Sequence, residues 1–201
     1  MINIKIRRPK IEDIQELNQF FRIVIIDTFN KEGIGDKLEG INNQIEIKEK
    51  YLINDFESNG EKRYFLIALN KEKIIGSIEY GPASGLINNC TNNDLKGLTE
   101  IGTVFVHPDY QKMGIGNLLL KKMYITLQGK GIEEFCLDSG YISAQKIWKK
   151  KFGEPDYLLN DYWGKGYDHM IWKIKVSELL NEHSDSMSAS NNFCRRNPYK
   201  E

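Results

Sequence analysis

One stretch of the sequence decides the fold: Val104–Asn117, which reads Val-Phe-Val-His-Pro-Asp-Tyr-Gln-Lys-Met-Gly-Ile-Gly-Asn. The apolar run over residues 98–106 predicts a strand that ends before Pro108. Apolar residues then recur at helical spacing, which predicts a helix over about 116–128. The few residues between them must therefore form a tight turn from a strand directly into a helix.

Gly114 and Gly116 make this turn suited to an anion. Glycine adopts positive φ angles readily, and it lets a ligand approach the backbone because no Cβ stands in the way. The start of a helix adds N–H groups without partners and the positive end of the helix dipole. A strand, a glycine turn and a helix in this order are typical of a site for a phosphate or pyrophosphate.

Two common phosphate motifs fit this turn poorly. The nucleoside-triphosphate loop ends in Gly-Lys-Ser/Thr, which Gly116-Asn117-Leu118 does not supply. The dinucleotide fingerprint needs a third glycine where Leu119 stands and an acidic residue on the next strand. Asp138 could serve as that acidic residue, so the dinucleotide motif stays open as a weak match.

Composition argues against several classes of protein. The 201 residues carry 28 Lys plus Arg and 28 Asp plus Glu, so the formal net charge is zero. Nucleic-acid binding relies largely on positive charge, so we expect no nucleic-acid partner. No apolar run approaches the roughly 20 residues of a membrane helix, so we expect no membrane partner. The length and the 40% of hydrophobic residues suit one domain with some additional chain.

The cysteines and the N-terminal pattern bear on the compartment. Cys90, Cys136 and Cys194 are odd in number and far apart, and they include no CxxC pair. This usage argues against a disulfide framework and a structural zinc site, and it fits a reducing compartment. The first residues alternate polar and apolar side chains as a strand does, unlike a signal peptide. We therefore expect a cytoplasmic protein without a metal.

The remaining pattern predicts further elements on both sides of the turn. Helical spacing marks residues 11–25, 41–56 and 143–152, and strand patterns mark 2–8, 63–69, 73–80, 132–138, 157–163 and 167–176. The order β-α-α-β-β-β-α-β-α-β-β predicts one α/β domain with mixed strand directions. We expect it to span residues 1–176, with a long loop at 81–97 and a polar C-terminal tail at 177–201.

The turn resembles the acetyl-CoA motif of a known family. Val106-x-Pro108 followed by Gln111-x-x-Gly114-x-Gly116 is similar to that motif in the GCN5-related N-acetyltransferases, the GNAT family. The resemblance covers about residues 2–176 and extends to the element order, to Ile6-Arg7-x-Pro9 with Asp13, and to Ala144-x-x-Ile147-Trp148. It implies an α/β (α+β) fold with a central twisted sheet of six to seven strands and about four flanking helices.

The resemblance also implies a coenzyme site, with acetyl-CoA as co-substrate and no metal. Strand backbone near Val104 would polarise the thioester carbonyl, and that of Phe105 and Val106 would pair with the pantetheine arm. The pyrophosphate would be held by the amides of Met113, Gly114, Ile115, Gly116 and Asn117, with polar or cationic contacts from Gln111 and Lys112. The alternative is a tight turn that binds nothing.

The same resemblance implies catalytic residues. Glu100 lies where many family members carry a glutamate that acts as general base, and the alternative is a solvated glutamate or one paired with a lysine. Many relatives place an acidic tyrosine four residues after an alanine, but here Trp148 follows Ala144, and an indole N–H is not a practical acid. Tyr141, where relatives often carry an asparagine that contacts the coenzyme, or Ser143 beside it could substitute. Tyr141 is our candidate acid, with a half-buried core tyrosine as the alternative. A thiol also leaves tolerably without assistance.

The predicted function is therefore direct transfer of an acetyl group from acetyl-CoA to a primary amine of a small molecule or to an exposed amino group of a peptide. A non-catalytic acyl-CoA-binding or sensor module with the same fold is the alternative, and Trp148 motivates it. Transfer to a ribosomal protein also stays open, whereas the zero net charge disfavours tRNA. The acidic side chains of residues 27–58 are compatible with a cationic acceptor, and dimers are common in this kind of fold.

Overall fold

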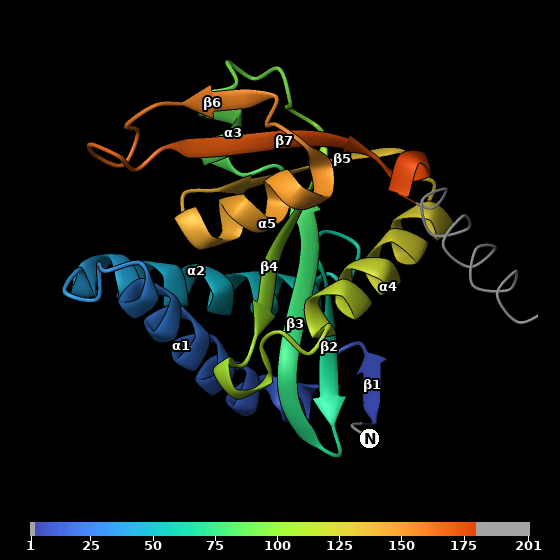
Figure 1. Cartoon of the computed structure of the whole chain (residues 1–201). Coiled ribbons are helices and arrows are strands. Elements are labelled where there is room, and N and C mark those ends of the chain that lie inside the picture. Colours follow the sequence, from blue (N-terminus) through green and yellow to red (C-terminus); the bar gives the residue numbers. More distant parts are fainter. Residues whose placement is uncertain (1–2, 180–201) are drawn as a thin grey trace, which may run out of the picture.

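A twisted sheet of seven strands organises residues 3–179, the part of the chain that the computed structural model describes (Figure 1). Its order is β1-β2-β3-β4-β5-β7-β6. The strands are β1 (Ile4–Arg7), β2 (Tyr64–Asn70), β3 (Lys73–Pro82), β4 (Thr99–Val106), β5 (Glu134–Ser139), β6 (Tyr157–Leu159) and β7 (His169–Lys175). Within the described residues β4 and β5 pair in parallel, and the other neighbours pair antiparallel. This mixed sheet confirms the predicted fold class.

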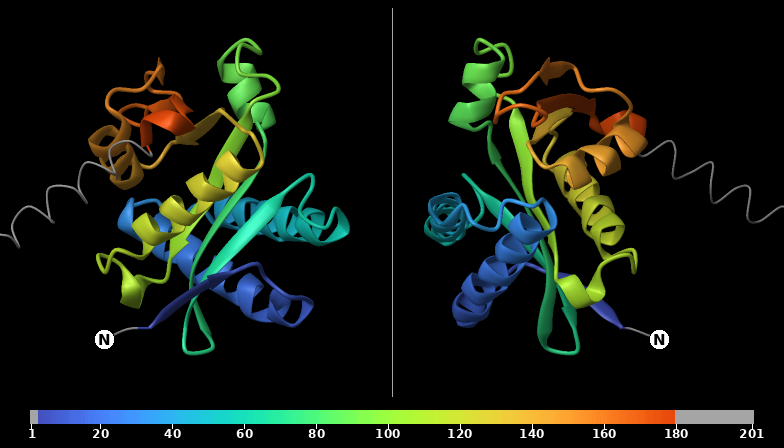
Figure 2. Two further views of the ribbon diagram at one scale, coloured as in Figure 1. Left: turned by 90° about the vertical axis from the view of Figure 1, so that its right-hand side faces the viewer. Right: turned by 60° about the vertical axis from the view of Figure 1, so that its left-hand side comes forward.

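Helices cover both faces of this sheet. The α-helices are α1 (Ile14–Lys31), α2 (Leu38–Glu57), α3 (Gly85–Cys90), α4 (Ile115–Gly129) and α5 (Ile142–Phe152), and short 3₁₀ turns are η1 (Ile11–Asp13) and η2 (Pro108–Tyr110). Figure 2 shows the α1–α2 pair and α4 on opposite sides of strands β2 to β4. None of the helices of residues 3–179 is both long and apolar enough to cross a bilayer.

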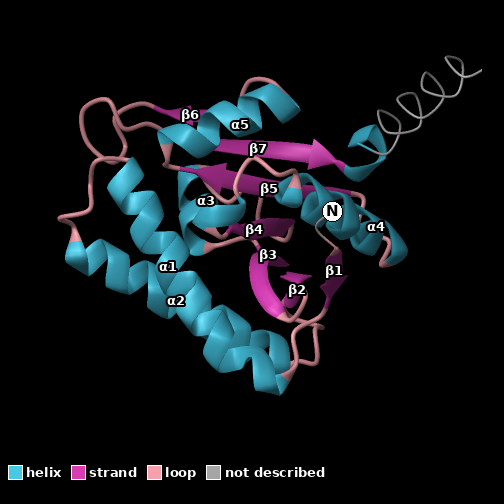
Figure 3. Ribbon diagram, turned by 60° about the horizontal axis from the view of Figure 1, so that its bottom comes forward, coloured by secondary structure: helices cyan, strands magenta, loops and turns pink. Residues whose placement is uncertain are grey.

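The core divides according to the faces of the sheet. Side chains alternate between faces along a strand, so neighbouring residues enter different clusters. One cluster joins β2 to β5 and β7 with α4 and α5, and it includes Leu119, Phe135 and Trp172. On the other face a second cluster packs α1 and α2 on β2 and β3 (Figure 3). A third, smaller cluster joins α3 to β5 and β7.

Strands β4 and β5 diverge soon after they begin, and this divergence positions the site. Their parallel register holds only for Thr99 with Phe135 and Glu100 with Cys136. Further along β4 the register with β3 shifts, and Thr103 has a φ of +51°. A bulge of this kind bends a strand and interrupts its pairing. The second half of β4 therefore has no β5 partner along its edge.

Two element predictions were wrong. Residues 81–97 contain α3, which Ser84 caps by accepting a hydrogen bond from the Ile87 N–H at 3.3 Å. Ile87 and Leu95 are fully buried there, so apolar burial stabilises a segment that its Asn and Gly content disguises. The strand predicted at 157–163 is only the three residues of β6. In the predicted tail, Leu179 packs against the main core, and residues 180–201 lie outside the described residues.

Candidate functional site

The turn between β4 and α4 presents backbone N–H groups to solvent. Lys112 and Gly114 both have positive φ, at 63° and 81°, and Gly114 is the N-cap of α4. The first helical hydrogen bond runs from the Leu118 N–H to the Gly114 carbonyl, so the amides that precede Leu118 lack a carbonyl one turn earlier. Successive amides in this conformation form a concave site for an anion.

The packing of α4 on the sheet fixes this turn. Ile115 is buried, whereas Lys112, Met113, Gly114 and Asn117 are exposed. A Cβ at Gly76 of β3 would lie only 3.0–3.1 Å from side-chain carbons of Leu119 and Ile115. At Gly116, by contrast, a Cβ would meet only Val106 Cγ2, at 3.8 Å. Gly76 therefore serves close helix packing, and the space above Gly116 is open to a ligand.

Gln111 links the turn to two neighbouring elements. Its side-chain Nε2 donates to the Val106 carbonyl at 3.3 Å, and its Oε1 accepts from Lys31 Nζ at 2.9 Å. Lys31 also pairs with Asp27 one turn earlier in α1, at 2.6 Å. These bonds hold the end of α1 against the turn and place the Lys31 cation beside it. The sequence pattern did not predict this contact.

The unpaired edge of β4 leads from this turn toward Glu100. Val104 and Val106 contact the core that α4 covers, and Phe105 contacts the core under α1, with its ring centroid 6.3 Å from that of Phe21. On its other side β4 pairs with β3 through Ser77–Phe105 and Gly76–Val106. Backbone groups on the β5 side of residues 104–106 therefore border the gap between the diverging strands. The resemblance assigns pantetheine binding to this backbone.

Glu100 is a buried carboxylate near the start of β4. Its residue is 7% exposed, and the Ser84 N–H at the start of α3 donates to its Oε2 at 2.6 Å. Burial, followed by the negative charges of Asp138 and Glu79, raises the pKa of Glu100 to about 7. Such a carboxylate takes up a proton at neutral pH far more readily than an exposed glutamate does. The alternative of a solvated glutamate does not fit this burial.

Glu79 of β3 is one of these neighbours, and its own charge is paired. Arg63 pairs with it at 2.5 Å, and the Thr103 hydroxyl donates to it at 3.2 Å. Glycines provide the space for this ion pair, because a Cβ at Gly102 would lie 2.6 Å from Glu79 Oε1 and one at Gly81 would lie 2.4 Å from Arg63 Cζ. Arg63 thus balances the charge of Glu79, which leaves Glu100 without a directly paired cation in the hydrogen-bond and ion-pair contacts of residues 3–179.

Tyr141 lies at the other side of the gap, where β5 ends and α5 begins. Its ring packs against Phe29 with centroids 5.9 Å apart, and burial raises the pKa of its hydroxyl to about 12. Glu32, which follows α1, accepts the N–H groups of Ile142 and Ser143, each at 3.0 Å. Glu32 therefore caps α5 and fixes Tyr141 beside α1. The ring packs as the core alternative predicts, and its role as an acid stays a prediction.

Trp148 belongs to the core. It is 9% exposed, and its ring stacks on Phe152 with centroids 5.8 Å apart and planes 16° apart. Ala144 packs against the same cluster. The indole thus fills the space between α5 and the sheet. The departure from the family tyrosine is accommodated by packing.

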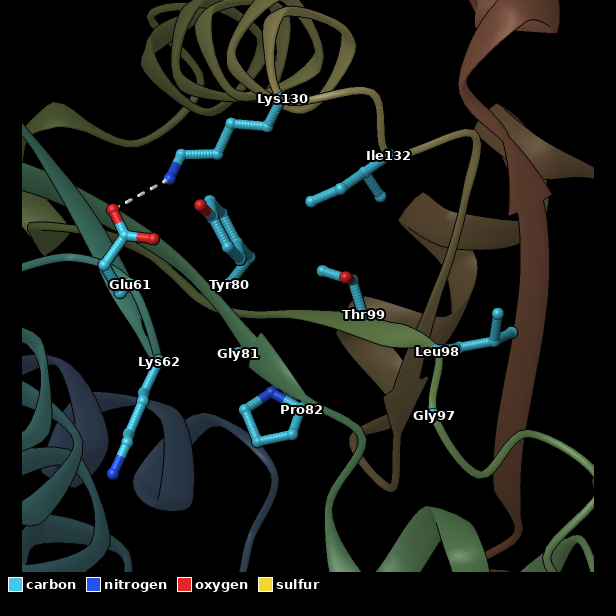
Figure 4. Close-up of a pocket in the computed structure, with 10 residues that line it drawn as sticks. All are labelled: Glu61, Lys62, Tyr80, Gly81, Pro82, Gly97, Leu98, Thr99, Lys130 and Ile132. Carbon is cyan, nitrogen blue, oxygen red and sulfur yellow. Dashed lines mark ion pairs between the residues drawn. The ribbon is translucent and has the colours of Figure 1, made fainter. Parts of the chain in front are cut away.

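Two surface pockets lie away from these residues. The first, of about 620 Å³, lies between the start of β4 and the end of α4, and Tyr80, Thr99 and Lys130 line it (Figure 4). Lys130 already interacts there with Glu61, at 3.9 Å, and with the Tyr80 hydroxyl. The second, of about 500 Å³, is lined by residues of the α4–β5 connection and the end of β7. Neither pocket includes a predicted site residue.

Sequence reasoning missed Glu79 and Asp138 as neighbours of Glu100, and it missed His169 as a neighbour of Asp138. His169 is 2% exposed, and among residues 3–179 its Nε2 has no partner in hydrogen-bond geometry. A charged residue inside the apolar run of β3 was the available signal for Glu79. Of the acids in residues 27–58, Asp27, Glu32 and Asp55 have structural partners, the last being Arg8 at 2.7 Å. Cys136 is buried.

Comparison with known proteins identifies the family. Comparison with curated proteins gives no match. The paiA N-acetyltransferase from Thermoplasma acidophilum, solved in complex with coenzyme A, is similar with a TM-score of 0.62 and 22% identity over 87% of this chain and 99% of that one. The ribosomal-protein-alanine N-acetyltransferase from Brucella melitensis gives 0.61 and 17% over 85% and 99%. Salmonella typhimurium yncA, solved with its cofactor acetyl-CoA, gives 0.62 and 14% over 87% and 94%. These likenesses show the fold.

The sequence itself matches the family model of the acetyltransferase (GNAT) family over residues 36–154, more than half of its length, and the chain therefore belongs to the GNAT acetyltransferases.

Proposed function

We propose that this protein transfers an acetyl group from acetyl-CoA directly to a primary amine of a small molecule or to an exposed amino group of a peptide. Glu100 acts as the general base, and the turn at residues 111–117 holds the coenzyme pyrophosphate. The single observation that carries the proposal is the placement of Glu100: a buried carboxylate on the same strand whose far half has an unpaired edge and ends in an anion-binding turn.

The residues present fit acetyl-CoA. The backbone amides of Met113 to Asn117, at the start of α4, suit a diphosphate, and the open space at Gly116 admits its close approach. Lys31 supplies a cation next to the turn. The free edge of β4 offers peptide groups to the amide-containing pantetheine arm, as a neighbouring strand would. Solved relatives of the same fold that contain coenzyme A or acetyl-CoA support this assignment.

The chemistry requires removal of a proton before the amine can attack, because an amine is cationic at neutral pH. Glu100, with a pKa near neutrality, accepts that proton directly or through a water molecule. The amine nitrogen then bonds to the thioester carbonyl carbon while the C–S bond breaks. Backbone N–H groups of β4 stabilise the charge on the carbonyl oxygen. The leaving thiolate takes a proton, for which the Tyr141 hydroxyl is the candidate donor.

The non-catalytic alternative is less well supported. It was motivated by Trp148, which now has a packing role. A module that only bound acyl-CoA would gain nothing from burying Glu100 beside two further carboxylates, and burial of unpaired charge destabilises a fold. The ribosomal-protein-alanine N-acetyltransferase of similar fold keeps peptide amino groups among the candidate acceptors.

The test is an acetyl-transfer assay with a panel of primary amines and of peptides with free N-termini. Thiol release is followed in solution, and the acceptor is checked by mass spectrometry for one added acetyl group. We expect both signals for at least one acceptor class. Binding of acetyl-CoA without acetylation of any acceptor would contradict the proposal and favour the non-catalytic module.

A further inference from the structure

Two more titratable side chains lie on the same sheet face as Glu100, the face that α1 to α3 cover. Asp138 of β5 and His169 of β7 point to this face, because their neighbours Leu137 and Met170 belong to the core cluster on the opposite face. Within the described chain His169 Nε2 lies 3.1 Å from Asp138 Oδ2. The two side chains therefore form a pair on neighbouring strands.

Asp138 borders the gap between the diverging strands. It lies two residues beyond Cys136, the last β5 residue in register with β4, and Gly102 across the gap has no side chain. Its negative charge raises the pKa values of Glu100 and Tyr141, so it is within electrostatic reach of both predicted catalytic residues. Its side chain is 22% exposed, which leaves it accessible to a ligand.

His169 is held in one orientation by Trp163. The indole Nε1 donates to His169 Nδ1 at 3.2 Å, so in the neutral ring the proton is on Nε2, the nitrogen that faces Asp138. This Nε2 is buried and has no partner in hydrogen-bond geometry among the described residues. Such a group is costly unless a partner completes it. A small rotation of the Asp138 carboxylate would complete the bond.

The surroundings of His169 are built around this contact. A Cβ at Gly140 would lie 2.5 Å from Trp163 Nε1, so glycine there is what lets the indole reach His169. Gln145 donates from Nε2 to the carbonyls of Ser139 and Asp168, at 3.0 and 2.9 Å, and so fastens the segment that carries Trp163 to β5. Although it makes these contacts, Trp163 remains 49% exposed.

We propose that Asp138 binds the cationic amine of the acceptor beside Glu100, and that His169 is the positioning residue that holds the Asp138 carboxylate toward it. This inference rests on the proposed function, in which Glu100 takes the proton of that amine. Two carboxylates on either side of the gap then share the ammonium: one fixes it and the other deprotonates it.

The groups that face Glu100 and Asp138 are few enough to test separately. Glu100 faces Glu79 of β3, whose charge Arg63 balances, and from α2 it faces Lys48, which lowers its pKa. Tyr51 of α2 and Cys136 of β5 are neutral at pH 7, because the pKa of each is raised to about 12. Asp138 faces His169, Glu100, Cys136, Tyr51 and Tyr141.

The first test measures Glu100 itself and needs no acceptor. The full chain is labelled with ¹³C in the glutamate carboxyl groups, the Glu100 signal is assigned with Glu100→Gln, and its titration is followed by NMR. In Asp138→Asn the midpoint should fall by about one pH unit, because a nearby negative charge is removed. Glu134→Gln is the matched control, since Glu134 lies on the same strand and face but pairs with Lys173. A midpoint unchanged by Asp138→Asn would overturn the proposal.

The second test uses steady-state kinetics with an acceptor from the amine panel. Asp138→Asn should raise the KM for the acceptor about tenfold or more, because an ion-paired hydrogen bond is lost, and leave the KM for acetyl-CoA unchanged. His169→Leu should change the acceptor KM and the Glu100 midpoint in the same directions as Asp138→Asn does, but by smaller amounts. His169→Gln, which can still donate an N–H, should restore them in part.

The outcomes separate this inference from the proposed function. A wild-type protein that acetylates no amine overturns both. If the protein acetylates an amine, but neither Asp138→Asn nor His169→Leu alters the acceptor KM or the pH profile, this inference alone is overturned. If His169→Gln behaves like His169→Leu while thermal midpoints are equal, His169 does not position Asp138. A double variant, Asp138→Asn with His169→Leu, should be no worse than Asp138→Asn alone, because His169 acts through Asp138.

Discussion

The two ends of β4 carry the two halves of the site, and they are constructed differently. At its C-terminal end, the turn at residues 111–117 offers backbone amides as the proposed binding groups. At its N-terminal end Glu100 lies near Glu79 and Asp138, and His169 contacts Asp138, so the cluster draws on three other strands. The first half is a local conformation that consecutive residues determine. The second exists only once the sheet has its register and twist.

This difference predicts which half of the site varies among proteins of this fold and which half they share. A backbone site needs only glycines and a helix start, so it can serve one coenzyme in many proteins of one fold. A side-chain cluster depends on single residues, and each substitution changes its charge and shape. We therefore expect acceptor specificity to depend on the cluster, and coenzyme binding to depend on the turn. Three substitutions and a change of pH test this division, ordered from the largest expected effect to the smallest.

Replacement of Glu100 with Gln should separate the two halves most strongly. We expect kcat to fall by about 100- to 1,000-fold, because a general base contributes on this scale. The Kd for acetyl-CoA should stay within about a factor of two, since Glu100 contributes nothing to the turn. Initial rates and calorimetric titration of the same samples measure the two values. Glu133→Gln, an exposed neighbour of β5, is the control.

The free energy of unfolding should fall as pH rises, because Glu100 ionises in a buried position near other carboxylates. The pKa of Glu100 is raised in the folded state, so its protonated form stabilises the fold, and this contribution is lost as pH rises from about 4.5 toward the folded pKa of about 7. The loss is on the order of 3 kcal/mol for Glu100 alone. Burial of Asp55 raises its pKa to about 6 and adds to the same trend.

Thermal midpoints measured from pH 5 to pH 8 check this expectation. The wild type should lose several degrees over this range, at about 2–4 °C per kcal/mol. Glu100→Gln should lose less, because Gln does not ionise. Equal slopes for the two proteins would show that Glu100 is solvated, and the contrast between the two ends of β4 would then fail.

Replacement of Gly116 with Val should affect only the coenzyme half. The side chain would occupy the space above the turn, where only Val106 Cγ2 stands near. We expect the Kd for acetyl-CoA to rise about ten- to hundredfold, since charge-assisted hydrogen bonds to the diphosphate are lost. The Glu100 titration should be unchanged. Gly129→Ala, at the other end of α4 with no atom near its Cβ, controls for a general effect on the helix.

Removal of the Glu32 carboxylate should give the smallest effect. Glu32→Ala leaves the Ile142 and Ser143 amides at the start of α5 without their partner. The loss of a helix cap costs about 1 kcal/mol of unfolding free energy, measurable by urea denaturation. A loss below about 0.3 kcal/mol would indicate that the Glu32 contact with α5 is incidental.

The turn and the fold class could be predicted from the sequence because their signals are local. Glycines at fixed spacing and apolar periodicity need no knowledge of distant residues. Helix α3 was missed because its six residues, Gly85–Cys90, are too few to show a helical period. Ser84, which caps the helix, was a readable signal. The surroundings of Glu100 could not be predicted, since β4 meets β5, and Asp138 of β5 meets His169, only through pairing of strands that are distant in the sequence. Gly140, which admits Trp163, is uninformative until that indole is placed.

A thermal-shift titration with acetyl-CoA, CoA, ATP and NAD side by side tests the central claim most directly, since every step here depends on the coenzyme occupying the turn. At 100 times its dissociation constant, a ligand stabilises the fold by about 2.7 kcal/mol. We predict a rise of about 5–10 °C with acetyl-CoA and CoA, and none with ATP or NAD. A rise with NAD or ATP instead, or no rise with the CoA species, would contradict the account of this turn and of the site built beside it.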